Sequence, residues 1–321
     1  MSSIRSESAN GQLRSLTLSV QDHVTILEGR KMGRKAKDAR WVDALTVPGQ
    51  FVGLCEGTEA PDADAQPTKV LAIASSPYDA KRNSAMLDAA LVEVLVDRAG
   101  DEMETRLSQL APGSLVHVTQ VIGSGYVHLV RIWETDTAFT LHSFGTLFGE
   151  GEGLSVAMEE GHNLVMIGAG TQCVFFKSKP HAHQCRPRGL ASLRACVEWT
   201  PVQAHASTRA VSLFILADSP QAVGFVKDFD NWRASGVRVH PIYCHPQQLA
   251  QNNGDGAALS PREVLEQELF PCDALGKPTD MYARACTVLM SGLTPDLMKS
   301  LTKQLIQRGV AVQRILCAGD L

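Results

Sequence analysis

Two glycines at the end of an apolar run are the first residues whose spacing suggests chemistry. The run NLVMIGAGT ends in Gly168, Gly170 and Thr171. In such a turn, the missing side chains let the backbone approach a phosphate at the start of the next helix. Gln172 follows, and its large polar side chain occupies space that a dinucleotide needs. Dinucleotide binding and the simple packing of a helix on a strand both stay open, and the sequence favours packing.

A histidine-rich loop is the second constellation. The segment KSKPHAHQCRPR, residues 177–188, places His181, His183 and Cys185 close together. Imidazole and thiolate groups are zinc ligands. Their spacing matches no zinc pattern, however, so we expect a solvated loop and no metal site. No arrangement of serine, histidine and acid in the sequence suggests hydrolysis.

Basic residues gather in two stretches, residues 30–40 and 177–194. Such stretches can steer an acidic partner toward the chain, either an electron-carrier protein or a surface of a larger complex. The alternative is that both loops are simply solvated. The net charge of -4 does not indicate nucleic-acid binding.

The composition is that of a globular protein. Of 321 residues, 44% are hydrophobic and 20% are charged, which suffices for two domains with their own cores. No apolar run is long enough to cross a bilayer, so we expect no membrane span. Eight cysteines scattered through strand-like runs are expected to be reduced and buried. The polar residues 1–12 predict a flexible N-terminus and resemble no secretory signal, although an organelle-targeting remnant stays open.

The hydrophobic rhythm divides the rest of the chain into two domains. From residue 13 to 128, short alternating runs broken by turn residues predict an antiparallel barrel. The periodicity fades over 129–160, which we interpret as an insertion or interdomain connection. From 161 to 321, apolar strands alternate with amphipathic helices and predict a parallel sheet covered on both faces. Two helices of this domain are expected to end at Gly236 and Gly309.

Specific segments, in this order, resemble the ferredoxin-NADP reductase superfamily. VPGQFVGL at 47–54 is similar to a family strand that ends in Pro-Gly-Gln-Phe, and KVLAIASSP at 69–77 is similar to the flavin strand. Residues 99–126 resemble the loop and helix over the flavin pyrophosphate and the Gly-x-Gly turn that follows. The resemblance implies a Greek-key β-barrel of the flavin type, followed by a Rossmann-like, doubly wound, five-stranded parallel sheet. The Ala-Ile-Ala-Ser segment is most similar to plant chloroplast ferredoxin-reductase-like proteins, which favours a chloroplast over the cytoplasm.

The resemblance also implies where a flavin is held. In the family, an Arg pairs with the pyrophosphate, an aromatic ring packs on the isoalloxazine and a hydroxyl meets its edge; here these positions are Lys69, Leu71 and Ala72. Lysine keeps the positive charge but cannot make the two parallel hydrogen bonds of a guanidinium. Leucine lacks a flat ring for stacking, and alanine lacks a hydroxyl for the hydrogen bond. Backbone amides of residues 73–76 and 103–105 need no particular side chain to hold a phosphate. FAD therefore stays open against a ligand-free barrel, with FMN the less favoured flavin. The implied flavin positions are Lys69, Leu71, Ala72, Ile73, Ser75, Ser76, Met103, Glu104 and Thr105.

The second domain departs further from the family pattern. The implied nucleotide positions are Gly168, Gly170, Thr171 and Gly292, with Ser291 where the family has a catalytic thiol beside the nicotinamide. Serine keeps the hydrogen bond but not the polarizable contact of sulfur. Support for NADH or NADPH is therefore weak, and the lack of basic residues after the second strand favours NADH.

Two functions follow from this resemblance. The first is a flavin oxidoreductase that passes electrons between a nicotinamide nucleotide and a protein acceptor. The second is a reductase-derived accessory subunit without turnover, which the several changed cofactor positions favour. A fold does not carry its activity with it, so the sequence leaves both open.

Overall fold

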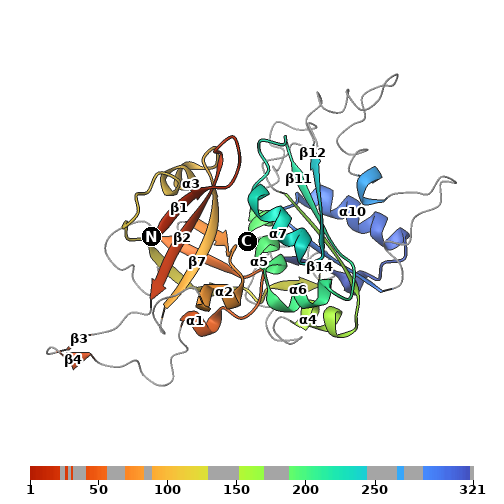
Figure 1. The fold of residues 1–321 in the computed structure, drawn as a ribbon, viewed down its shortest axis with the longest axis horizontal. Coiled ribbons are helices and arrows are strands. Elements are labelled where there is room, and N and C mark those ends of the chain that lie inside the picture. The colour runs from red at the N-terminus through yellow and green to blue at the C-terminus, as the bar shows by residue number, and fades with distance from the viewer. Residues whose placement is uncertain are drawn as a thin grey trace, which may run out of the picture.

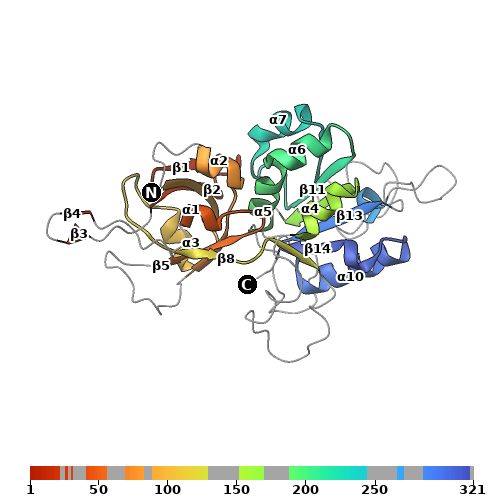
Figure 2. The ribbon, with the colours of Figure 1, turned by 90° about the horizontal axis from the view of Figure 1, so that it is seen from below.

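The computed structural model consists of two bodies side by side, with antiparallel strands in the first and a helix-covered sheet in the second (Figure 1). The same division is visible from below in Figure 2. The structure describes residues 1–21, 26–27, 30–31, 41–55, 69–82, 89–128, 152–169, 188–243, 266–270 and 285–318.

The first body encloses an apolar core between two antiparallel sheets, ordered β1-β2-β7 and β6-β5-β8. Successive side chains of a strand face opposite sides, and the inward ones, among them Leu16, Val52 and Val94, are completely buried. The strands are β1 Ser3–Ser6, β2 Leu13–Gln21, β5 Phe51–Cys55, β6 Lys69–Ala72, β7 Ala89–Asp97 and β8 His117–Ile122. The other elements are the hairpin of β3 Ile26–Leu27 and β4 Arg30–Lys31, and helices α1 Trp41–Ala44, α2 Pro77–Arg82 and α3 Glu102–Leu107.

The second body is a sheet with the order β12-β11-β10-β13-β14-β9 in the described part of the chain. Its first five strands pair in parallel, whereas β9 is antiparallel to β14. The strands are β9 Tyr126–His128, β10 Asn163–Ala169, β11 Val211–Ala217, β12 Val237–Tyr243, β13 Cys286–Ser291 and β14 Ile315–Ala318. The helices are α4 Glu152–Glu159, α5 Arg188–Val197, α6 Thr200–Ala206, α7 Phe229–Ala234 and α10 Pro295–Gln307, with short 3₁₀ turns η3 Val226–Asp228 and η5 Val312–Arg314.

Helices cover both faces of this sheet. Leu164 of β10 lies in the cluster that includes α4, α5, α6 and α7, whereas the next residue, Val165, lies in the cluster that includes α10. Burial on both faces explains why these strands are continuous apolar runs in the sequence. The predicted fold class, an antiparallel barrel followed by a doubly wound parallel sheet, is confirmed. Helix α5 lies against β6 and β7 and so forms the contact between the two bodies.

The predicted flexible N-terminus is wrong for residues 3–6. They form β1 and pair antiparallel with residues 14–17 of β2. The amino group of Met1 also donates a hydrogen bond to the carbonyl oxygen of Ser114 at 2.6 Å. A four-residue strand that is mostly exposed shows no clear two-residue hydrophobic period, so the sequence pattern does not reveal it.

The boundary between the domains also differs from the predicted one. Strand β9 falls inside the predicted barrel segment 13–128, yet it pairs with β14 and belongs to the second sheet. Within the predicted connection 129–160, α4 packs on the same sheet through Leu154. The part of that connection before residue 152 lies outside the described residues. A three-residue strand carries too little pattern to be assigned to either domain.

We expect Gly236→Ala to lower the free energy of unfolding by about 1–3 kcal/mol. Gly236 follows α7 with a φ of +96°, and a Cβ there would lie 2.8 Å from the carbonyl oxygen of Ala206. Gly309, which follows α10, is a matched control because its φ is +91° but nothing lies within 4 Å of its Cβ position. Gly309→Ala should therefore cost only about 1 kcal/mol. Urea denaturation measures both, and equal losses would contradict a steric role for the Ala206 contact.

Candidate functional site

The side chains of the predicted flavin strand are enclosed by protein. Leu71 and Ile73 belong to the apolar core of the barrel and are each 1% exposed. Ala72 faces the other way and joins the apolar cluster shared with the α/β domain. Met103 of α3 is buried in the barrel core as well. None of these four side chains therefore offers a surface on which a flavin ring can pack.

Lys69, the predicted phosphate-binding cation, is paired inside the protein. Its side chain is 8% exposed and contacts the carboxylates of Asp101 and Glu104, with 2.6 Å between Nζ and Oε1 of Glu104. Asp101 also caps α3, because its side chain accepts a hydrogen bond from the Glu104 amide. Two negative charges thus outweigh one positive charge, and a phosphate that approaches Lys69 is repelled by both carboxylates.

The predicted serine hydroxyls are engaged in local structure. Ser75 Oγ accepts a hydrogen bond from the Glu93 amide at 3.2 Å. Ser76 Oγ donates to Asp79 Oδ2 at 2.5 Å and accepts from the Asp79 amide, which fixes the start of α2. Both serines are at least nine-tenths buried. They hold the backbone after β6 and are not directed at a ligand.

Backbone amides that were expected to be available to a phosphate are also paired. The amides of Ile73 and Ala74 donate to carbonyl oxygens of neighbouring segments. In α3, the amides of Glu104 and Thr105 donate to the side chain and the carbonyl oxygen of Asp101, respectively. The Thr105 hydroxyl donates to a backbone carbonyl oxygen at 3.2 Å. These four amides are therefore already paired within the protein.

At the nucleotide end of the sheet, Ser291 is buried rather than open to a ligand. Its Oγ lies 2.6 Å from Oγ of Ser192 in α5, and the two residues are 2% and 0% exposed. Gly168 is a packing glycine, because a Cβ there would lie 2.4 Å from a methyl carbon of Leu193. Gly292 has a φ of +67°, which the absence of a side chain permits. The packing interpretation of Gly168 agrees with this geometry.

The start of α5 holds two residues that the sequence pattern did not single out. A Cβ on Gly189 would lie 2.1 Å from the carbonyl oxygen of Ser291, so only glycine permits α5 to approach β13 this closely. Ser192, one turn later, is the hydrogen-bond partner of Ser291. The sequence does hold a signal for Gly189 and Ser192. If residues 172–188 are treated as an insertion, GAGT is followed directly by GLASLR, and the two together have the pattern of one longer glycine turn.

The described residues do not fit a flavin held as the resemblance implies. Within the predicted set, Lys69 is neutralised by its neighbours, both serine hydroxyls support backbone, and the ring position is occupied by a core leucine. A pyrophosphate would add about two negative charges beside Asp101 and Glu104, against one ammonium. In a largely buried place this repulsion is poorly screened by salt.

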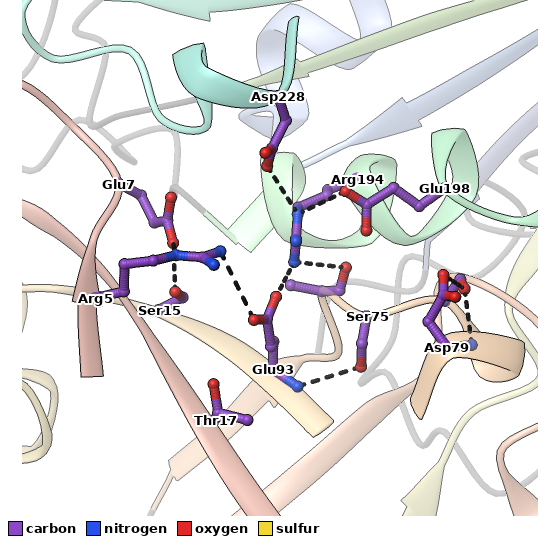
Figure 3. A network of polar contacts seen from close by, with 12 residues as sticks. Arg5, Glu7, Ser15, Thr17, Ser75, Asp79, Glu93, Arg194, Glu198 and Asp228 are labelled. Atoms are coloured by element: carbon purple, nitrogen blue, oxygen red, sulfur yellow. Dashed lines mark hydrogen bonds and ion pairs between the residues drawn. The ribbon is translucent and has the colours of Figure 1, made fainter. Parts of the chain in front are cut away.

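A network of ion pairs joins the two domains instead (Figure 3). Arg194 of α5 contacts the carboxylate of Glu93, which belongs to β7 of the barrel. Its Nε lies 3.1 Å from Glu198 Oε1 and 3.5 Å from Asp228 Oδ2, both in the α/β domain. The guanidinium also lies over the Phe225 ring, 4.7 Å from its centroid. With only 9% of its side chain exposed, Arg194 is a buried electrostatic link between the domains.

The N-terminal strand extends this network. Arg5 donates to Glu7 Oε1 at 2.6 Å and lies 3.7 Å from Glu93. Ser15 Oγ donates to the same oxygen of Glu7 at 2.5 Å. The Phe225 amide donates to the carbonyl oxygen of Glu7 at 3.1 Å, which ties the α/β domain to the chain just after β1. Residues predicted to be flexible thus help to fasten the domains together.

The predicted docking stretches are only partly described. Arg194, the last residue of the basic stretch 177–194, is buried in the network and is not part of an exposed patch. Residues 177–187 and 32–40 lie outside the described residues. The predicted acidic partner stays a prediction.

An acidic cleft of about 280 Å³ opens beside the network, between α2 of the barrel and the helices α5, α6 and α7. Its described lining carries three carboxylates and no basic side chain, so it disfavours a flavin or nucleotide phosphate. The lining residues are Tyr78, Asp79, Glu198, Thr200, Gln203, Asp228, Asn231 and Trp232.

Burial raises the pKa of Glu198 to about 7. The nearby carboxylates of Asp228 and Glu93 act in the same direction, whereas the guanidinium of Arg194 opposes the shift. Several carboxylates share one arginine, so the cluster holds a proton near neutral pH.

The remaining predictions concern thiols, metals and membranes. The described cysteines are free and buried, as expected of reduced thiols, and burial raises the pKa of Cys286 to about 12. The described cysteines are Cys55, Cys196, Cys286 and Cys317. Among the described residues, no three potential ligands are grouped as a metal site requires. The histidine loop, Gly170 and Thr171 lie outside the described residues. Of the helices that are described, none combines the length and apolarity that crossing a bilayer requires.

Comparison with known proteins supports the fold through structure and not through sequence. No protein-family model matches the sequence, and no curated protein sequence matches it. Solved structures do match over nearly the whole chain. The FAD/NAD binding domain of nitric oxide dioxygenase from Vibrio cholerae O1 biovar El Tor superposes with a TM-score of 0.51 at 13% identity, covering 98% of this chain and 94% of that one.

Two further solved structures show the same likeness. Amycolatopsis cytochrome P450 reductase GcoB matches with a TM-score of 0.52 at 16% identity, covering 99% of this chain and 67% of that one. The CS-b5R domains of human Ncb5or, in the NAD+ form, match with a TM-score of 0.53 at 12% identity, covering 99% of this chain and 68% of that one. This chain therefore has the two-domain fold of ferredoxin-reductase-like FAD/NAD-binding proteins.

We expect Arg194→Met to lower the free energy of unfolding by about 3–5 kcal/mol, because it leaves three partly buried carboxylates without their cation. Arg233→Met is the matched control. Arg233 is 50% exposed and pairs with the highly exposed Asp230 at 3.1 Å, so its loss should change stability by less than about 0.5 kcal/mol. Urea denaturation followed by tryptophan fluorescence compares the two. A loss below about 1 kcal/mol for Arg194→Met would contradict the role of this link.

We expect Glu198→Gln to flatten the pH dependence of stability between about pH 4.5 and pH 7. The folded pKa of Glu198 is raised from 4.5 to about 7, so its contribution is fully present below pH 4.5 and is lost as pH rises through 7. Glutamine cannot ionise. The difference in unfolding free energy between variant and wild type should therefore shift in favour of the variant by up to about 3 kcal/mol from pH 4.5 to pH 8. Glu102→Gln is the control, because the Glu102 side chain is 81% exposed. If the unfolding free energy of Glu198→Gln changed with pH in parallel with that of the wild type, the raised pKa of Glu198 would be refuted.

Proposed function

We propose that this chain is a reductase-fold protein that works without flavin turnover, as an accessory subunit of a larger complex. The observation that carries this proposal is the pairing of Lys69 with Asp101 and Glu104. A flavin of this fold needs a positive charge for its pyrophosphate, and here that charge is already balanced by the protein itself. The enclosure of Leu71 and Ser291 supports the same conclusion at the ring and nicotinamide positions.

The interface between the domains supports a scaffold role. In reductases of this kind the two domains hold a cofactor between them, as the resemblance implies. Here, buried ion pairs around Arg194 and a continuous apolar cluster join the barrel directly to the α/β domain. Leu13 and Phe51 of the barrel belong to that cluster together with Leu190 of α5. This direct contact between the domains is consistent with a protein whose role is to bind other proteins.

The partner included in this proposal is an acidic protein surface. Residues 30–40 contain six basic residues and one acidic residue, and residues 177–188 add further positive charge. Charge of this kind steers association and makes it weaken with rising salt. An electron-carrier protein or an acidic surface of a larger assembly fits this description. A chloroplast location is part of this proposal, because the resemblance is to chloroplast proteins.

A flavin oxidoreductase is the second candidate. Its support is the likeness of the fold to FAD/NAD-binding domains of other proteins. In this reading, the chain takes FAD and passes electrons between a nicotinamide nucleotide and a protein acceptor. The described residues offer no free cation at the implied pyrophosphate position, and for that reason we place this candidate second.

Flavin binding by the purified full-length chain separates the two candidates. We expect no flavin absorbance to co-elute with the protein after incubation with FAD or FMN, and no change in Tm. A flavin supplied at 100 times its Kd would stabilise the protein by about 2.7 kcal/mol, which thermal unfolding detects easily. Stoichiometric flavin that NADH or NADPH bleaches would establish the oxidoreductase and overturn the accessory role. If flavin binds, Lys69→Met shows whether the binding depends on Lys69.

A further inference from the structure

We propose that the carboxylate of Glu104 is an internal anion, which occupies the place beside Lys69 where an oxyanion such as a phosphate would otherwise bind. Removing this carboxylate should convert the place into a binding site for phosphate or pyrophosphate. The inference rests on the proposed function, because a wild-type chain that held a flavin phosphate at Lys69 would leave Glu104 no such role.

The first argument is the position of the cation. Lys69 and Glu104 are both 8% exposed in their side chains, and Nζ lies 2.6 Å from Oε1. A buried ammonium requires a partner anion, since an unpaired charge in the interior is strongly destabilising. Asp101 is the other carboxylate in contact, but its side chain is 55% exposed. Glu104 is therefore the buried partner of Lys69, and Asp101 stands on the solvent side.

The second argument is how the other oxygen of Glu104 is held. Oε2 accepts a hydrogen bond from the Asp97 amide at 3.2 Å. It also lies directly over Gly100, where a Cβ would be only 2.4 Å away. The carboxylate thus sits between an ammonium group, a backbone amide and a glycine without a side chain. These are the kinds of group that surround a bound oxyanion in proteins.

The third argument concerns what lies nearby in the folded chain. Asp97 is completely buried next to this place, and burial raises the pKa of its carboxyl group. Asp101 and Glu104 already contact the Lys69 ammonium, so in the wild-type chain Lys69 has no capacity for another anion. Removing the Glu104 carboxylate leaves an unfilled space and takes away one negative charge, while Lys69 keeps Asp101 as a partner. The Asp101 side chain next to Lys69 is 55% exposed, so solvent lies close to this position.

The test is anion rescue of Glu104→Ala in the full-length chain. Thermal unfolding is measured in inorganic phosphate, in pyrophosphate and in NaCl at equal ionic strength. We expect the Tm of Glu104→Ala in NaCl to lie below that of the wild type, and to rise by at least about 2 °C in phosphate or pyrophosphate. Phosphate also stabilises folded proteins in general, because it is excluded from their surface, so the measured quantity is the rise in the Tm of Glu104→Ala in excess of the rise in the wild-type Tm. If Glu104→Ala does not fold in NaCl, the yield of folded protein after refolding in each salt gives the same comparison.

Three variants make the result specific. Glu104→Gln keeps the volume of the side chain and should not respond to phosphate, because the space stays filled. The double variant Lys69→Met with Glu104→Ala lacks the cation and should not respond either. Glu102→Ala, at an exposed position of the same helix, controls for a general effect of removing one acidic residue.

The inference is overturned if phosphate leaves Glu104→Ala unchanged, or if the variant without Lys69 responds equally. Failure of the proposed function has a different signature, namely stoichiometric flavin on the wild-type chain. The two outcomes are measured on different proteins with different ligands, so each can be recognised on its own.

Discussion

The joint between the two domains depends on one buried guanidinium. Arg194 reaches from α5 to the carboxylate of Glu93 in the barrel, and it also pairs with Glu198 and Asp228 of its own domain. A charge of this kind is stable in the interior only if its partners stay in place, so the position of each domain constrains the other. The guanidinium itself is only 9% exposed and lies over the Phe225 ring, so its ion pairs are weakly screened by water. Three segments meet at this joint: strand β1, the turn that follows it at Glu7, and the residues just before α7, Phe225 and Asp228.

The same kind of charge pairing occurs at a second position in the barrel. Lys69 is held by Glu104 and Asp101, much as Arg194 is held by its carboxylates, and in both places the protein supplies the negative charge itself. A reductase fold that binds cofactors must leave cations and amides unpaired until the ligand arrives. Here, the described cations and hydroxyls at the implied cofactor positions are paired in advance. In the described part of the chain the fold is kept although these positions are occupied by contacts within the protein, which illustrates why architecture alone does not assign activity.

Much of the architecture was predictable, because it depends on patterns that are local in the sequence. The continuous apolar runs of β10, β11 and β13 indicate a sheet buried on both faces, and Gly236 and Gly309 indicate helix ends. Features without a local pattern were not predictable. Strand β1 is short and exposed, and β9 has only three residues, so their pairing partners decide where they belong.

The sequence by itself determined the fold class and which residue types stand at the implied cofactor positions. These include Lys69 where the family has an arginine and Leu71 where it has an aromatic ring. It could not determine what those residues contact. Only the tertiary structure decided that Glu104 neutralises Lys69, that Ser192 meets Ser291, and that the end of a basic stretch is a buried link. The physical reason is that these contacts join residues far apart in the chain. Charge and hydrogen bonding act over a few ångströms in space, whatever the separation in sequence.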